Sequence, residues 1–558
     1  MPVTDYTIFE RNMLALCTGR NLPTAARIRN AQPSRTISFE PARSGMLVPQ
    51  LQRNGRRYSI HSRFDPEAEG EKAAEGYPQR GFFIFLGLGA GYSITPFLNN
   101  NKLSRGIIID FDAGMIRSLL ETLDLTSILA DRRLDFIVDP EPEELQELFI
   151  SAYIPSLYGN LSVVPLRGRV DENSVIFQQA SDHIRALMEG VSDDYSVQAF
   201  FGKRWFANII RNLQQAAGST PPIGPIQKAV VTAAGPSLEL AINDLRNLPK
   251  DVFLIATDTS LSVLLGFGIQ PSAVISIDCQ HISYYHFMRG IPAGIPVFLD
   301  LASPPTVARL AGGSYFFSSG HPLARYVTAR LRAYPILDTS GGNVTHAAVS
   351  LADFLGAQRI DLYGADFSYP AGKAYARGSY IYPYFDIRQS RLAPSEALFS
   401  HFLFRNKSMD HEMDCEGHVR FITKPLVAYR ERLERLGQSC ASRLVPHIGN
   451  GMPIQGSPPN QIRQDFGKVF AAGRLFRSTQ EFLEEYRDDI AGLELPGSSA
   501  GLYLAGLKHK ERDIWMTLLP AAAAIRRESG DPNPEPEAIL ETTRRWCLSK
   551  VQEALDSL

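Results

Sequence analysis

Small polar and acidic residues follow three successive apolar strands predicted in the middle of the chain. The strand that begins at Ala229 turns at Ser237, the next strand ends at Asp258, and the third ends at Asp278. In an open α/β sheet the carboxyl ends of neighbouring strands converge on the crevice where ligands bind. Helix capping would explain Ser237 or Asp258 taken singly, but the convergence favours a ligand site. Its candidate residues are Gly235, Pro236, Ser237, Asp258, Thr259, Ser260 and Asp278.

Two further polar turns follow farther along the chain. A helix is expected to begin after the Gly341-Gly342-Asn343 turn, and the strand RIDLYGADF carries Gly364 and ends at Asp366. The free N–H groups and positive dipole end of a helix N-terminus attract an anion. Asn343 alone would be a typical helix cap. Asn343 occurs in the same domain as the Gly235 turn and Asp366. This combination predicts that two helix N-termini hold a phosphate without a metal ion.

The segment AGKAYARGSYIYPYFDIRQS is rich in tyrosine, contains arginines and has no regular period. Such a composition predicts a loop that becomes ordered over a bound ligand. Tyrosine hydroxyls and arginines suit a phosphate or a carboxylate. Tyr380 and Tyr382 are the candidates, and an aromatic packing loop is the alternative.

A glycine-rich turn also occurs nearer the N-terminus. The segment GFFIFLGLGAGY predicts an apolar strand followed by a tight turn at Gly89 and Gly91, and the next strand ends at Asp110. An acidic residue about 20 positions after such a turn meets a ribose in dinucleotide-binding folds. The alternative is that these glycines only pack the strand against a helix. Asp110 and Asp112 also form a DxD pair, for which capping serves as well as metal binding.

These turns require α/β elements to position them, and the chain is long enough for several domains. Its 558 residues exceed what one hydrophobic core usually supports. The segment GSTPPIGPIQ, residues 218–227, predicts a domain boundary, and apolar residues occur at helical spacing after Gly456. The predicted fold class is α/β. It comprises a Rossmann-like N-terminal domain (1–217), a central α/β domain with a parallel sheet (218–456) and a helical C-terminal domain (457–558).

Composition and charge exclude several classes of protein. The 57 Lys and Arg nearly balance 59 Asp and Glu, so no overall field favours nucleic acid or an anionic membrane. The five cysteines include no CxxC pair, which is typical of free thiols in a reducing compartment. No stretch reaches the ~18 apolar residues of a membrane span, and no signal-peptide pattern is present. We therefore predict a cytoplasmic protein whose oligomeric state the sequence leaves open.

The motifs taken together resemble a known family. GPSL after a strand, ATDTSL after the next, SIDCQ, GGNVTHAA and YGADFSYPAG look like the central domain of the motility-associated flagellin glycosyltransferases, called Maf proteins. IHSRFDP and LVPHIGNGMPIQG extend the resemblance over roughly residues 50 to 456. GPSL and the GADF element are also similar to motifs of bacterial sialyltransferases that use CMP-sialic acid.

The resemblance implies a metal-independent transfer of a nonulosonic acid, such as pseudaminic or legionaminic acid. The donor would be its CMP ester and the acceptors Ser or Thr of flagellin, as filament assembly and motility require. The three strand ends would then bind the donor together with Gly341, Gly342, Asn343, Gly364, Tyr380 and Tyr382. No cofactor is expected, and flagellin is the expected partner.

One departure from the family pattern concerns catalysis. Many members continue the motif with Gly-Lys-Thr-His, whereas this chain has Gly-Lys-Ala-Tyr, which puts Tyr375 at the histidine position. A base must take the acceptor proton, and the candidate catalytic residues are Asp366, His418 and Tyr375. His418 and the nearby His401 are also compatible with structural or surface roles.

Two other functions remain open. GPSL and the Asp-ended strands also resemble archaeal-type pterin diphosphokinases, which would use ATP and magnesium. The GLGAGY turn alone would fit a non-catalytic nucleotide-binding or methyltransferase-like scaffold.

Overall fold

The computed structural model describes the chain except for residues 1–5, 18–20, 54–55, 101, 172, 406–408, 414–416, 448, 459–460, 498–499 and 532–533. Two compact units make up the chain. The first comprises Met1–Gly202 and Gly492–Arg545, and the second comprises Lys203–Ala491 and Trp546–Leu558. The three predicted domains follow one another along the chain, whereas each unit combines an earlier segment with one from the C-terminal region.

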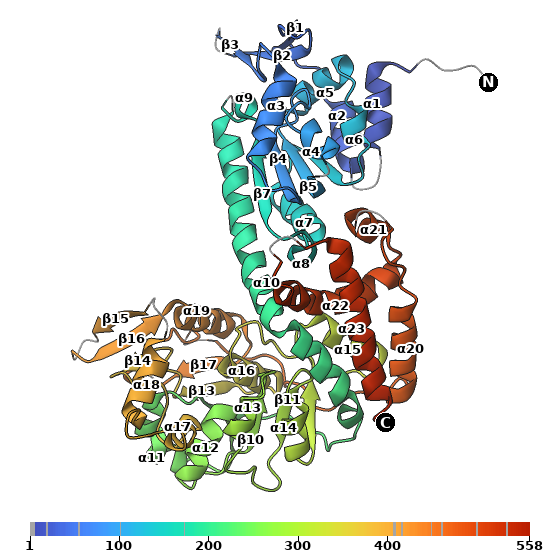
Figure 1. Cartoon of the computed structure of the whole chain (residues 1–558). Helices are drawn as coiled ribbons and strands as arrows, with labels where there is room; N and C mark the ends of the chain where they lie inside the picture. Colours follow the sequence, from blue (N-terminus) through green and yellow to red (C-terminus); the bar gives the residue numbers. More distant parts are fainter. Residues whose placement is uncertain are drawn as a thin grey trace. The chain divides into compact units, whose positions relative to one another are not determined.

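A parallel sheet forms the centre of the first unit (Figure 1). Its strands are β4 (Gly81–Leu86), β5 (Leu103–Asp110), β6 (Leu134–Val138) and β7 (Leu161–Pro165). Their spatial order is β6-β5-β4-β7, with every neighbouring pair parallel. All residues of β4 are buried, which explains its uninterrupted apolar sequence, because parallel sheets are covered on both faces.

Helices of 4 to 20 residues belong to the same unit as this sheet, and so does a small antiparallel sheet. The helices are α1 (Ile8–Leu16), α2 (Leu22–Asn30), α3 (Pro66–Glu75), α4 (Thr95–Asn99), α5 (Ala113–Thr122), α6 (Thr126–Leu129), α7 (Pro142–Ala152), α8 (Pro155–Tyr158), α9 (Arg167–Val170), α21 (Ala500–Gly506) and α22 (His509–Glu528). The antiparallel sheet consists of β1 (Ile37–Pro41), β2 (Leu47–Arg53) and β3 (Arg56–Ser59).

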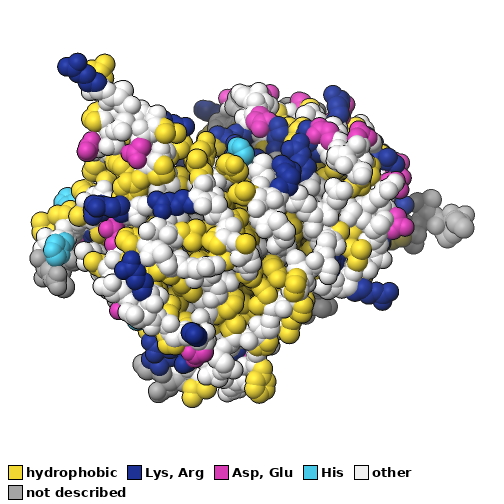
Figure 2. Space-filling model, turned by 90° about the horizontal axis from the view of Figure 1, so that it is seen from below, with side chains coloured by type: hydrophobic (Ala, Val, Ile, Leu, Met, Phe, Trp, Pro, Cys, Tyr) yellow, Lys and Arg dark blue, Asp and Glu magenta, His cyan; other side chains and the backbone are white. Residues whose placement is uncertain are grey.

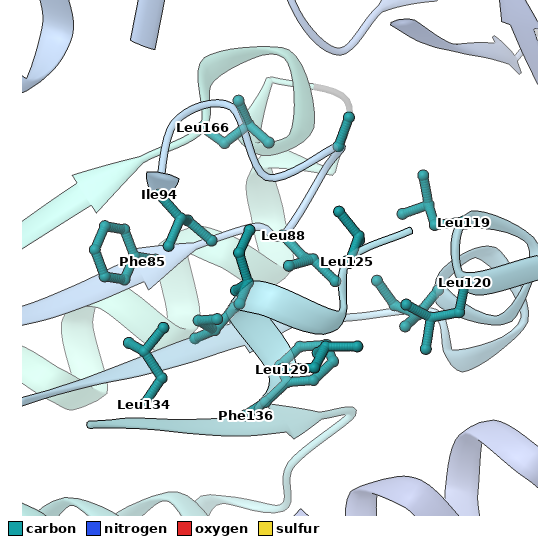
Figure 3. Packing of buried hydrophobic residues seen from close by; sticks show 14 of the residues in the cluster. Phe85, Leu88, Ile94, Leu119, Leu120, Leu125, Leu129, Leu134, Phe136 and Leu166 are labelled. Atoms are coloured by element: carbon teal, nitrogen blue, oxygen red, sulfur yellow. The ribbon is translucent and has the colours of Figure 1, made fainter. Parts of the chain in front are cut away.

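The hydrophobic core of the first unit joins its sheet to its helices. Figure 3 shows Phe85 and Leu134 of the sheet in one cluster with Leu119 of α5 and Leu129 of α6. Leu88, which follows β4, belongs to the same cluster and is fully buried. The glycine-rich turn that contains Leu88 is therefore anchored in the core.

A larger parallel sheet forms the centre of the second unit. Its strands are β8 (Lys228–Thr232), β9 (Val252–Thr257), β10 (Ala273–Ser276), β11 (Val297–Asp300), β12 (Ser314–Phe317), β13 (Arg359–Tyr363) and β17 (Arg443–Pro446). The spatial order is β12-β11-β10-β9-β8-β13-β17, and every neighbouring pair is parallel. The chain adds strands outward from β8 and then returns to the other side of β8 with β13, so the strand order reverses between these two strands. Ligands of open α/β sheets bind at such a switch point.

Helices connect the strands of the second unit, and a second antiparallel sheet adjoins them. The helices are the 3₁₀ helix η2 (Pro236–Ala241), α11 (Ile242–Arg246), α12 (Asp258–Gly266), α13 (Ser283–His286), α14 (Pro305–Leu310), α15 (Pro322–Arg330), α16 (Val344–Phe354), α17 (Ile381–Asp386), α18 (Ser395–Phe404), α19 (Lys424–Ser439) and α20 (Thr479–Ala491). The sheet has the order β14-β16-β15, with β14 (Tyr369–Pro370), β15 (Met409–Met413) and β16 (Val419–Thr423).

Two long helices begin in the first unit and end in the second, α10 (Ser174–Ala216) and α23 (Pro536–Leu555). The predicted α/β fold class with parallel sheets is confirmed, and so is the helical C-terminal region, which consists of α20 to α23. The free-thiol prediction holds for Cys17, Cys279, Cys440 and Cys547. Cys415 lies outside the described residues.

Within the described part of the chain, no helix is both long and apolar enough to cross a bilayer. The face drawn in Figure 2 carries both basic and acidic side chains among apolar and uncharged ones. This mixture agrees with the balanced net charge of −2.

Candidate functional site

The predicted site residues of the central domain follow the carboxyl ends of neighbouring strands in the seven-stranded sheet. Thr232 of β8 pairs with Ala256 of β9 on one side and with Tyr363 of β13 on the other. The turns after these three strands therefore lie at one edge of the sheet, where the strand order reverses. This register brings the Ser237, Asp258 and Asp366 segments to the same edge.

Ser237 and Asp366 are joined directly at the switch point. The Ser237 N–H donates to Asp366 Oδ2 at 2.9 Å, and the Gly235 N–H donates to the Gly364 carbonyl at 2.8 Å. Burial raises the pKa of Asp366, and the hydrogen bonds from the hydroxyl and amide of Ser237 oppose that rise. Gly235 is required because a Cβ there would lie 2.5 Å from Asp366 Oδ2.

This contact corrects the phosphate site expected at the Gly235 turn. The Ser237 N–H already has an acceptor, and Pro236 opens a short 3₁₀ helix, η2, in place of an α-helix N-terminus. A glycine-rich segment also closes over the pair. A Cβ at Gly449 would overlap Ser237 Cβ, and the Met452 N–H donates to the Asp366 carbonyl at 2.8 Å. Ser237 and Asp366 therefore brace two strand ends.

Asn343 caps α16, which is the plainer of its two sequence interpretations. Its side chain accepts the His346 N–H at 3.0 Å and donates to the Gly341 carbonyl at 3.2 Å. The preceding Gly342 has a φ of +72°, a conformation that glycine adopts without strain. The His346 side chain continues this network, with Nε2 3.2 Å from Asp338 Oδ2.

Asp258 begins α12 and is almost fully buried. Ser276 Oγ donates to its Oδ2 at 2.6 Å, and the Thr259 N–H and Oγ1 contact its Oδ1 at 2.6 and 3.0 Å. Burial alone would raise the pKa of Asp258. The contact with His286, the positive charge of that ring when it is protonated, and these hydrogen bonds hold the pKa below its ordinary value. The site thus contains a buried carboxylate that stays ionised.

His286 is the partner of that carboxylate, and sequence analysis did not predict it. Its Nδ1 lies 3.3 Å from Asp258 Oδ2, and its ring centroid lies 4.5 Å from that of Tyr380. The side chain is buried at the end of α13. The available signal was the pair of histidines, His281 and His286, just after the strand that ends in Asp278. Their order in the sequence did not indicate which one faces Asp258.

The tyrosine-rich loop contacts the same cluster. Its backbone is tied to the β8 turn, because the Ala376 N–H donates to the Ala234 carbonyl at 2.8 Å. Tyr375 and Tyr380 share a hydrogen bond, with ring centroids 5.9 Å apart, and burial raises the pKa of both hydroxyls. The negative charge of Asp258 raises both values further. The loop therefore supplies neutral hydroxyls, and Tyr375 is unsuited to the role of a base.

The remaining predicted residues have different surroundings. Burial raises the pKa of Asp278, as does the Asp258 charge, while its Oδ1 accepts the Gln280 N–H at 2.8 Å. The Ser260 hydroxyl is buried and lies 3.0 Å from both the Thr232 hydroxyl and the Thr257 carbonyl, so it packs the strand ends together. The Tyr382 hydroxyl donates to the Tyr375 carbonyl at 3.4 Å.

The two histidines named near β15 and β16 are both exposed. His401 lies in the last turn of α18, and His418 immediately precedes β16. The described residues include no group of three or more His, Cys, Asp or Glu side chains arranged to hold a metal ion.

The glycine-rich turn of the first unit is filled by the protein itself. The Leu88 N–H donates to Asp110 Oδ2 at 2.7 Å, and the Ala90 N–H donates to His61 Nε2 at 2.9 Å. Asp110 is fully buried and its Oδ1 lies 3.1 Å from Arg169 Nε. Burial lowers the pKa of His61 to about 4, which keeps the ring neutral as an acceptor. The packing alternative for these glycines is therefore the better account.

Asp112 has a capping role, because its side chain accepts the Met115 N–H at 2.9 Å at the start of α5. The DxD pair thus consists of one carboxylate paired with an arginine and one helix cap.

Comparisons with known proteins add three findings. An uncharacterized protein of Treponema pallidum (strain Nichols) is 33% identical over 166 residues, which are 29% of this chain and 79% of that protein. The chain belongs to the same family as that protein. A second uncharacterized protein of the same organism is 34% identical over 155 residues, and the match spans about half of its length, 54%. Residues 203–372 match the family model described as 6-hydroxymethylpterin diphosphokinase MptE-like.

One solved structure shares the fold over nearly the whole chain. It is the MAf glycosyltransferase from Magnetospirillum magneticum AMB-1, with a TM-score of 0.56 and 14% sequence identity. The alignment covers 98% of this chain and 95% of that one. At this identity the likeness shows a common fold.

Proposed function

We propose that this protein is a glycosyltransferase that moves a nonulosonic acid from its CMP ester to Ser or Thr hydroxyls of flagellin in the cytoplasm. The observation that carries the proposal is the fold shared with the Magnetospirillum magneticum glycosyltransferase over 98% of the chain. The ordered resemblance of GPSL, ATDTSL, GGNVTHAA and YGADF to Maf motifs supports it. The acceptor, the sugar and the involvement of motility rest on that resemblance.

The chemistry requires a site that stabilises a leaving nucleotide phosphate beside a developing cation. Cleavage of a CMP-sugar builds positive charge on the anomeric carbon and negative charge on the phosphate. In this site the Tyr375–Tyr380 pair supplies hydroxyl donors for anionic oxygens, and the Asp258 carboxylate supplies negative charge. Ser237 and Asn343 hold the strand and helix ends that position these groups, since their own polar atoms are engaged.

A second candidate function is transfer of diphosphate from ATP to a hydroxymethylpterin. The match of residues 203–372 to the MptE-like model favours it. The model covers less than a third of the chain, whereas the glycosyltransferase fold covers both units. We therefore place it second.

A ligand panel in a thermal-unfolding experiment separates these functions. A ligand that binds only the folded protein stabilises it by about 2.7 kcal/mol at 100 times its Kd. Stabilisation by CMP alone supports the glycosyltransferase, and stabilisation only by ATP with magnesium supports the diphosphokinase. Stabilisation by S-adenosylmethionine would support the methyltransferase-like scaffold and contradict both.

The control for the panel is Gly89→Ala in the first unit. Loss of the CMP response in that variant while it remains folded would place the nucleotide at the GLGAGY turn and contradict the proposed site.

A further inference from the structure

His286 combines two features that suit proton transfer. Its ring is buried with Nδ1 3.3 Å from a carboxylate oxygen of Asp258. At this distance Nδ1 is buried and faces the carboxylate but makes no well-aligned hydrogen bond. The other ring nitrogen, Nε2, has no hydrogen-bond partner among the residues that the structure describes. Nδ1 thus faces a fixed charge, and Nε2 is left for a ligand.

The Asp258 carboxylate favours one tautomer of this ring, because it lies 3.3 Å from Nδ1. Its Oδ1 contacts the Thr259 amide and hydroxyl, and its Oδ2 receives Ser276 Oγ at 2.6 Å. A carboxylate held in this way attracts the proton of a neutral imidazole to Nδ1. The lone pair then lies on Nε2, where it can accept a proton.

We propose that His286 is the general base that takes the proton from the acceptor hydroxyl, with Asp258 as its positioning residue. This inference rests on the proposed function for the identity of the acceptor. The acceptor oxygen forms a bond to the anomeric carbon as the bond from that carbon to the CMP phosphate breaks. The electron pair leaves with the phosphate, and the acceptor proton moves to His286 Nε2. The imidazolium that results is stabilised by Asp258 and later releases its proton to water.

Three groups from three segments face the ring. Asp258 comes from α12, Asp278 from the loop after β10, and Tyr380 from the loop before α17. Asp278 is the rival base, because burial and the Asp258 charge raise its pKa. Its Oδ1 is held by the Gln280 N–H, however, and no second residue orients it in the way that Asp258 orients His286 within the described part of the chain.

The test compares His286→Gln and Asp258→Asn with His281→Gln, an exposed histidine in the same segment. CMP binding is measured by calorimetry, and transfer is measured with a CMP-activated nonulosonic acid and unmodified flagellin. We expect His286→Gln to lower kcat by about 10²- to 10⁴-fold with CMP affinity nearly unchanged. His281→Gln should behave as wild type in both measurements.

The inference would be overturned if His286→Gln transferred the sugar at a rate within twofold of wild type. It would also be overturned if Asp278→Asn lost transfer and His286→Gln did not. A wild-type protein that neither binds CMP nor transfers the sugar would contradict the proposed function instead. In that case ¹H–¹⁵N spectra of histidine-labelled protein still determine the tautomer of the His286 ring. The His286 signal is assigned as the one that is missing from the spectrum of His286→Gln. An Nδ1–H tautomer that is lost in Asp258→Asn supports the inference, and an Nε2–H tautomer contradicts it.

Discussion

The amide of Ser237 donates to the carboxylate of Asp366 at 2.9 Å, although 129 positions separate the two residues in the sequence. The bond joins the turns after β8 and β13, the two strands between which the order of the sheet reverses. The switch point is therefore braced by an internal hydrogen bond. The groups that we propose to face the ligand, Asp258, His286 and Tyr380, contact one another through His286.

Asp366→Ala should destabilise the second unit. The change leaves the buried Ser237 N–H without its acceptor, which typically costs about 1–3 kcal/mol. The midpoint of urea unfolding should fall accordingly. Ser237→Ala keeps the backbone hydrogen bond and should therefore lower the free energy of unfolding by less than Asp366→Ala does. In the double variant the loss should be smaller than the sum of the two single losses, because both changes act on one contact. Full additivity would contradict the brace.

Asn343→Ala should destabilise α16 by about 0.5–2 kcal/mol because the helix loses its cap. Asn343→Asp is the matched control, since its side chain can still accept the His346 N–H. CMP affinity should stay within about threefold of wild type in both variants. A selective loss of CMP binding in a stable Asn343→Asp protein would show that the amide contacts the donor.

Gly89→Ala should destabilise the first unit without changing CMP affinity. A Cβ at Gly89 would lie 2.5 Å from His61 Nε2 and 2.6 Å from Leu166 Cδ2, and φ is +52°. Gly45→Ala is the control, because its φ is +85° but nothing lies within 4 Å of the added atom. In both variants the left-handed backbone should lower the free energy of unfolding by about 1–2 kcal/mol. In Gly89→Ala the overlap of the added Cβ with His61 and Leu166 should lower it by about 1–3 kcal/mol more. Equal losses would mean that His61 does not fill the turn.

Because of Asp300, the free energy of unfolding should fall as the pH rises from about 4 to about 6. It is buried at the end of β11 and accepts the Ala302 N–H at 2.7 Å, and burial raises its pKa to about 6 from the ordinary 3.8. Because the folded state binds the proton more tightly, the carboxyl favours folding below pH 4 and loses about 3 kcal/mol of that contribution by pH 6.

Asp300→Asn keeps an acceptor oxygen but does not titrate. The stability of this variant relative to wild type should therefore rise across the same pH interval, as measured by urea unfolding at each pH. A pH-independent difference between the two proteins would contradict the raised pKa.

The sequence predicted the local features of the fold well, because the apolar runs of parallel strands and their glycine turns depend on nearby residues. The strand before Leu88 and the strands before Ser237, Asp258 and Asp278 all form as expected. The same local evidence could not show which donors and acceptors were already satisfied. The Ser237 N–H is taken by Asp366, and the glycine-rich turn is filled by His61 from an earlier segment.

His286 was missed for the same reason. It lies 28 positions after Asp258 on a helix of four residues, which has no periodicity to reveal the face it presents. Only the parallel pairing of β9 with β10 brings its segment to Asp258. The contact between His286 and Asp258 therefore depends on how the strands pair in the sheet, which neither sequence motif specifies.

The most direct test of the central claim is the intact mass of flagellin after incubation with this protein and a CMP-activated nonulosonic acid, with and without a chelator. We predict mass increments of one nonulosonic acid residue per modified hydroxyl, unaffected by the chelator and absent with His286→Gln. Unmodified flagellin, together with ATP- and magnesium-dependent transfer of diphosphate to a hydroxymethylpterin by the same protein, would contradict the account.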